Sequence, residues 1–138
     1  MAKFYSVKDR VKITVGKVEV LIKPLTVQEK TEIQNTLGAV ATVGVGMSYM
    51  GAAKAIAYSV KGLKGVVVDD EGTEFELEKD DNGNLTDDCV SDLLNIPIGV
   101  SLTNIAMNLL NGLSDKITDN QGKPIKGIKI VGVEKGKK

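Results

Sequence analysis

The longest uncharged stretch of this chain, residues 93–114, limits its possible folds more than any other feature. It contains no Asp, Glu, Lys or Arg. Apolar side chains recur within it at intervals of three and four residues, which is the spacing of one face of an α-helix. This apolar stripe consists of Leu102, Ile105, Ala106, Leu109, Leu110 and Leu113. The pattern predicts an amphipathic helix that follows an N-cap at Ser101 and closes at Asn111–Gly112.

The opposite side of this predicted helix is polar but carries no charge. Its residues are Thr103, Asn104, Met107, Asn108 and Asn111, where a water-facing helix normally carries Lys and Glu. Because an unpaired charge costs far more to bury than an amide or a hydroxyl, such a face is easily covered by protein. Two interpretations stay open. Either another polypeptide docks on this face, or the helix is central in its own domain and both of its faces are covered.

A second stretch without charged residues, 33–53, contains Met47 and Met50, whose flexible side chains suit adaptable contacts. The sequence thus predicts a partner-binding surface with four residues from the amphipathic helix and the two methionines behind them: Asn104, Met107, Asn108, Asn111, Met47 and Met50. Both uncharged stretches are long enough to cross a bilayer. Their Asn, Gly and Pro residues argue against insertion, so we expect no membrane contact.

The remainder of the chain predicts short strands alternating with helices. Alternating apolar residues on both sides of Gly16 indicate an N-terminal β-hairpin over residues 11–22. Thr26 with Glu29 three residues later is a capping box that opens a helix, and Gly38 is its expected end. Further along, we expect a helix over 47–60, a second short hairpin over 66–77, a helix capped by Thr86, and a strand over 125–133. The fold class is therefore α+β, with an N-terminal β-hairpin followed by about four helices and a second short hairpin. We expect a single domain over residues 1–133 and a basic tail over 134–138.

Composition narrows the function. The 138 residues include 18 Lys+Arg and 18 Asp+Glu, so the basic surplus typical of nucleic-acid-binding proteins is missing. There is no histidine, which removes the most common general base and metal ligand, and Cys89 is the one cysteine. We expect Cys89 to fill the core rather than act as a nucleophile. The sequence favours a protein that is not an enzyme and has no cofactor.

One segment invites a metal-binding interpretation. Asp80, Asn82 and Asn84 occupy positions one, three and five of a calcium loop, but Leu85 and Ser91 stand where that loop needs Gly and Glu. A turn is the better explanation, and we expect no metal. The first ten residues also lack the apolar core of a secretory signal, so we expect the protein in the cytoplasm of its host cell.

The charges are balanced in number but segregated along the chain. Residues 69–92 hold eleven acids with Lys79 as the one base, whereas residues 116–138 hold seven lysines and two acids. The basic terminus could lie over the acidic middle of the chain. Alternatively, both segments are solvated surfaces, since salt screens separated surface charges.

Two segments carry a resemblance to a known family. The order of a hairpin, then Lys23-Pro24-Leu25-Thr26-Val27-Gln28-Glu29-Lys30-Thr31-Glu32-Ile33, then small-residue helices resembles the tail assembly chaperones of long-tailed bacteriophages. The run Leu85-Thr86-Asp87-Asp88-Cys89-Val90-Ser91-Asp92-Leu93-Leu94 is also similar to small phage tail proteins. The resemblance implies a non-enzymatic protein that binds the tape measure protein until tail tube subunits replace it. The alternative is a structural virion subunit, such as a neck, tail tube or tail completion protein, that forms a homo-oligomeric ring and stays in the particle.

Overall fold

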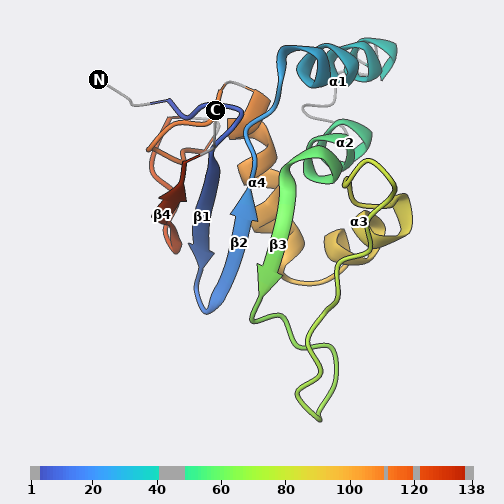
Figure 1. Ribbon diagram of the computed structural model, residues 1–138, viewed down its shortest axis with the longest axis vertical. Coiled ribbons are helices and arrows are strands. Elements are labelled where there is room, and N and C mark those ends of the chain that lie inside the picture. Colours follow the sequence, from blue (N-terminus) through green and yellow to red (C-terminus); the bar gives the residue numbers. More distant parts are fainter. Residues whose placement is uncertain (1–3, 41–48, 111, 120–121, 136–138) are drawn as a thin grey trace.

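The computed structural model describes residues 4–40, 49–110, 112–119 and 122–135. It has two layers: a four-stranded antiparallel sheet of order β3-β2-β1-β4, and helices that cover one face of it. Helix α4 lies behind the sheet in Figure 1, and α2 packs against α1, α3 and α4. The fold is the expected α+β class, with the expected N-terminal hairpin and four helices.

Strands β1 (Arg10–Val15) and β2 (Val18–Ile22) form the hairpin, in which Ile13 lies opposite Val20. Gly16 adopts a φ of 59° in the connecting turn, a conformation that other residues rarely reach. Alternate side chains of both strands point into the core and are fully buried, namely Val11, Ile13, Val20 and Ile22. The opposite face of the hairpin is polar, which is usual for an antiparallel sheet covered on one side.

Helix α1 (Val27–Val40) starts directly after Thr26, as the capping box predicts. The Glu29 backbone N–H donates to the Thr26 hydroxyl at 3.1 Å, and the Thr26 N–H donates to the Glu29 carboxylate at 2.8 Å. The predicted end at Gly38 is wrong, because the helix continues to Val40. Helix α2 (Tyr49–Ser59) follows after a segment outside the described residues.

The end of the second helix differs from the prediction. Helix α2 stops at Ser59, and Val60–Lys64 forms strand β3 beside β2. The Lys23 backbone N–H donates to the Ser59 carbonyl at 2.7 Å, so the chain changes from helix to strand where β2 offers a free edge. Gly65 ends β3 with a φ of 91°, and a Cβ at this position would lie 2.6 Å from the Lys17 carbonyl oxygen. The chain can leave the sheet here because glycine lacks that atom.

The predicted second hairpin is present only in a minimal form. Val67 and Glu74 make a single antiparallel bridge, supported by hydrogen bonds from Val68 N–H to the Thr73 carbonyl and from Phe75 N–H to the Val66 carbonyl. The Asp69 carboxylate accepts the backbone N–H groups of two residues in the turn. These bonds give the segment a defined shape without regular strands.

Helices α3 (Asp87–Leu94) and α4 (Ile98–Leu110) meet at an angle of 114°. Thr86 caps α3 as predicted, accepting the Cys89 N–H at 3.3 Å. The predicted cap of α4 at Ser101 is wrong, since the helix begins three residues earlier. Gly99 permits the tight corner, because a Cβ there would lie 2.6 Å from the Leu94 carbonyl oxygen.

Strand β4 (Ile128–Glu134) completes the sheet by pairing with β1, and it covers most of the strand predicted over residues 125–133. A buried cluster that extends from Val11 to Ile128 includes side chains of every helix and strand. The described part of the chain therefore shares one hydrophobic core.

Candidate functional site

The docking surface predicted on α4 is largely covered by the chain itself. The apolar stripe is buried as expected, and Asn104, Met107 and Asn108 on the other side are half-buried. Val100 is the exposed residue of this helix, with 73% of its surface accessible. The burial pattern favours the second interpretation of the missing charges, namely that α4 is central in its own domain.

Asn108 is occupied within its own chain. Its side-chain amide donates to the carbonyls of Asn104 and Thr118 at 2.8 Å each, and its side-chain carbonyl accepts the Thr118 N–H at 3.0 Å. The residue thus fastens the loop between α4 and β4 to the helix. Of the other predicted residues, Met50 belongs to α2, while Met47 and Asn111 lie outside the described residues.

A different surface combines exposed apolar side chains with a hollow of about 290 Å³. We call it the apolar hollow; its lining includes Phe4, Val7, Pro24, Leu25, Val27, Lys30, Leu109 and Leu113. Phe4, Val7 and Val27 are exposed large hydrophobic residues, and Val27 is 80% accessible. Apolar side chains gathered at a concave surface are typical of a protein-binding site. Sequence reasoning missed this surface, because Phe4 and Val7 belong to no periodic pattern.

Two contacts bring the N-terminal segment to the apolar hollow. Phe4 forms an antiparallel bridge with Ser114, and the Tyr5 N–H donates to the Leu113 carbonyl at 3.0 Å. Residues distant in sequence therefore form one wall. The first turn of α1 forms another wall. Helix α1 begins at Val27, directly after the capping residue Thr26, and Val27 and Lys30 line the hollow.

A buried ion pair holds the start of α1 in place. The Lys23 Nζ lies 2.6 Å from Glu29 Oε1, and their side chains are only 11% and 19% exposed. The same ammonium donates to the Pro24 carbonyl at 3.0 Å. Burial alone would raise the pKa of Glu29, but the hydrogen bonds from Lys23 and Thr26 outweigh this effect and hold the pKa below its ordinary value. This ion pair thus holds the start of α1, whose first turn lines the apolar hollow.

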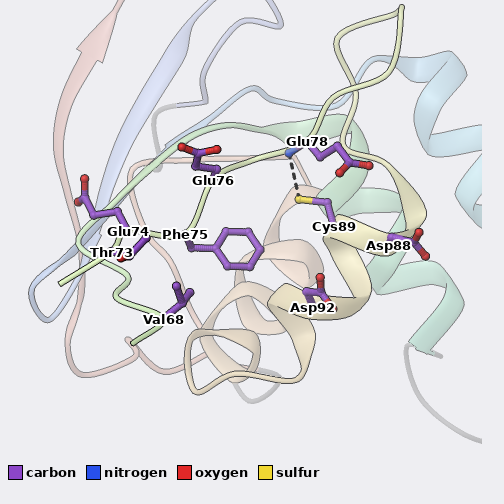
Figure 2. A pocket seen from close by; sticks show the side chains of 9 residues that line it. All are labelled: Val68, Thr73, Glu74, Phe75, Glu76, Glu78, Asp88, Cys89 and Asp92. Atoms are coloured by element: carbon purple, nitrogen blue, oxygen red, sulfur yellow. Dashed lines mark hydrogen bonds between the residues drawn. The ribbon is translucent and has the colours of Figure 1, made fainter. Parts of the chain in front are cut away.

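Figure 2 shows a second hollow, of about 420 Å³, between α3 and the segment after β3. Five carboxylates line it, those of Glu74, Glu76, Glu78, Asp88 and Asp92, with no basic residue among the lining side chains. The Phe75 ring lies toward α3, and the Glu78 backbone N–H donates to the Cys89 sulfur at 3.4 Å. Cys89 is 4% exposed, and burial raises the pKa of its thiol. It is a core residue, as predicted, and the raised pKa favours the neutral thiol.

The Asp80 turn uses its carboxylate for its own backbone. Asp80 Oδ1 accepts the N–H groups of Asn82 and Asn84 at 2.9 and 3.1 Å, so the predicted turn is confirmed. Among the described residues, no group of three or more Cys, Asp or Glu side chains is arranged to hold a metal ion.

Tyr58 of α2 is joined to α1 through its hydroxyl group. Its hydroxyl donates a short hydrogen bond to the Glu32 carboxylate of α1. This bond, together with burial, raises the pKa of Tyr58 to about 12, so the phenol stays protonated and links the two helices. No local pattern indicates this pair, because the two residues are 26 positions apart in the sequence.

Among the described residues, no single helix has the length and apolarity to span a membrane, and the α3–α4 pair that passes by composition is sharply bent. Models of protein families, curated proteins and solved structures give no match to this chain.

Proposed function

We propose that this protein is a bacteriophage tail assembly chaperone that binds the tape measure protein during tail morphogenesis and catalyses no reaction. The observation that carries the proposal is the apolar hollow, with its exposed Phe4, Val7 and Val27. One of its walls comes from the segment Lys23–Ile33 that resembles these chaperones, because Pro24, Leu25 and Val27 line it. The chaperone would act in the cytoplasm of the host cell.

The chemistry of the apolar hollow suits an amphipathic helix. Such a helix places apolar side chains in a groove at intervals of three or four residues, and charged groups at the rim contact its polar side. Lys30 provides a charge beside the apolar wall of Val27 and Leu109. Weak, reversible binding of such a helix suits a chaperone that tail tube subunits later replace on the tape measure protein.

Two matched substitutions test the proposal. Val27 and Val100 both lie in the first turn of a helix and are 80% and 73% exposed, but only Val27 lines the apolar hollow. An Asp in the first helical turn is favourable, so neither V27D nor V100D should unfold the protein. Since burial of a Val contributes roughly 1.5–3 kcal/mol, V27D should weaken binding of tape measure segments at least about tenfold.

The measurement is co-sedimentation of purified tape measure segments with each protein. The proposal expects the wild type and V100D to keep the segments soluble and V27D to lose this effect. If the wild type leaves their solubility unchanged, or if the two variants behave alike, the apolar hollow is not the binding site.

The alternative is a structural virion subunit, such as a neck, tail tube or tail completion protein, assembled as a ring. It is supported by the segregation of charge along the chain, since the segment that follows β3 is rich in acids and residues 116–138 are rich in lysine. Mass spectrometry of finished particles separates the two functions, since a chaperone is absent from the particle and a structural subunit is present.

A further inference from the structure

A projecting segment after β3 carries a concentrated negative charge. We call residues 66–76 the acidic arm; in Figure 1 it extends beyond the end of β3, and its Val68 and Phe75 line the hollow beside α3 shown in Figure 2. It contains five acids and no base, namely Asp69, Asp70, Glu71, Glu74 and Glu76. Val67 and Val68 are exposed at its base, so the arm also presents apolar surface. Backbone hydrogen bonds and the Asp69 carboxylate define its turn, and the half-buried Phe75 packs against the core.

The charge of the acidic arm is not neutralised within the described part of the protein. The ion pairs there are Lys12–Glu19, Lys23–Glu29 and Lys135–Asp9. None of them involves an acid of residues 69–92, which hold eleven carboxylates and one lysine. An exposed cluster of like charges beside apolar side chains is a surface that a cationic, partly apolar partner would stabilise.

The opposite edge of the sheet carries a surface of complementary chemistry. A hollow of about 600 Å³ lies along β4, and we call it the basic hollow. The half-buried Ile125 and Ile130 supply apolar surface, and the exposed Lys116 and Lys129 supply positive charge. Asp115 also lines it, so the lysines outnumber the acid by two to one. β4 is an edge strand, and the described residues contain no strand that pairs with its outer side.

The strand order keeps these two surfaces apart within one molecule. In the order β3-β2-β1-β4, the acidic arm follows β3 at one edge, and the basic hollow lies along β4 at the other. The acidic arm of one molecule therefore cannot dock in the basic hollow of the same molecule. This arrangement also excludes the expectation that the described basic residues of β4 lie over the acidic segment of the same chain.

We propose that the acidic arm of one copy docks in the basic hollow of a second copy. Val67 and Val68 then meet the isoleucines of the hollow while the arm's carboxylates face Lys116 and Lys129. Because the two contacting surfaces differ, the association is head-to-tail, and it generates a ring if the rotation between copies closes and a filament if it does not. The inference needs no tape measure protein, so its failure would leave the chaperone proposal intact.

Paired charge reversals test the contact. The hollow variant is K116E/K129E, and the arm variant is D70K/E71K/E76K. The arm variant leaves in place Asp69 and Glu74, whose carboxylates accept backbone N–H groups, and its three new lysines outnumber these two acids. A control, K8E/K54E, makes the same charge change as the hollow variant at exposed lysines outside both surfaces. In the hollow variant both surfaces are acidic, and in the arm variant both are basic, so copies of the same variant repel each other. In a mixture, the acidic hollow of one variant can bind the basic arm of the other.

The measurement is sedimentation velocity of the purified proteins at concentrations up to about 1 mM. We expect the wild type and the control to associate at about 0.1 M salt and to dissociate toward about 1 M, as the Debye length falls from about 10 Å to about 3 Å. Each variant alone should stay monomeric, and an equimolar mixture of the two should associate again.

Any of three results would overturn the proposal. One is a wild type that stays monomeric over the whole concentration range at about 0.1 M salt. The second is a mixture of the variants that fails to associate, and the third is a hollow variant that associates as well as the control. Circular dichroism of each variant shows whether it is folded, and the mixed sample tests the contact independently of either variant alone.

Discussion

Removing the charge of Glu29 should destabilise the fold in a way that depends on pH. Glu29→Gln keeps an oxygen that can accept the Thr26 N–H but loses the negative charge that faces Lys23 at 2.6 Å. A hydrogen bond between charged groups contributes about 1.5–3 kcal/mol. Because both side chains are less than one fifth exposed, water screens little of this interaction. We expect the free energy of unfolding at pH 7 to fall by about 2 kcal/mol.

The pH dependence follows from the lowered pKa of Glu29. In the unfolded chain the carboxyl titrates near its ordinary value of 4.5, and in the folded protein it titrates below that value. The unfolded state therefore takes up the proton first as the pH falls. The stabilisation by Glu29 is complete above the unfolded pKa and disappears as the pH passes down through the folded pKa. The difference between wild type and variant should shrink accordingly below about pH 4.5.

Urea denaturation followed by circular dichroism, at pH 7 and at about pH 3, measures both effects. Glu19→Gln serves as the control, because it removes the charge of a more exposed pair, whose N–O distance to Lys12 is 3.6 Å. That pair should contribute about 0–1 kcal/mol. The reasoning fails if the two variants lose the same stability, or if the loss in Glu29→Gln is as large at pH 3 as at pH 7.

Three further predictions concern individual side chains. Asn108→Ala should lower the free energy of unfolding, measured by urea denaturation, by about 2 kcal/mol, because it leaves the N–H and carbonyl of Thr118 without their partner. Asn104→Ala should lower it by about 0.5 kcal/mol. Equal losses would show that the Asn108 side chain does not hold the loop at Thr118. Ultraviolet titration should show Tyr58 ionising at about pH 12, and Glu32→Gln should lower that value toward 10.0, while a normal pKa in the wild type would exclude the hydrogen bond. Cys89 should react with a thiol reagent only as fast as the protein unfolds, since it is 4% exposed; rapid reaction in native buffer would show that α3 does not cover it.

Local chemistry made much of the fold predictable. The alternation around Gly16, the Thr26–Glu29 capping box and the Thr86 cap each act through residues that are neighbours in sequence, and all three appear in the structure. Strand β3 was missed because Val60 continues the helical spacing of α2 and Gly62 resembles a helix end. It becomes a strand because β2, about forty residues earlier in the chain, supplies the pairing partner.

The candidate site was less predictable, because exposure depends on tertiary contacts. The stripe of α4 was identified correctly, but the lack of charge on its other face fits both a free docking surface and a covered one. Only the contact between Asn108 and Thr118, made after the chain turns back, shows that the loop lies against this face. Conversely, Phe4 and Val27 gather at one hollow through a bridge to Ser114 that no local pattern indicates.

The pairing of β1 with β4 has a consequence for the order of folding. Thr14 and Lys129 lie side by side in the sheet although 115 positions separate them. During synthesis the ribosome must add that length of chain before the outer side of β1 acquires its neighbour, whereas the hairpin with β2 can form as soon as both strands have emerged. Until then, the unpaired edge of β1 can pair with a strand of another chain. When β4 pairs with β1, it covers this edge and prevents such misassembly.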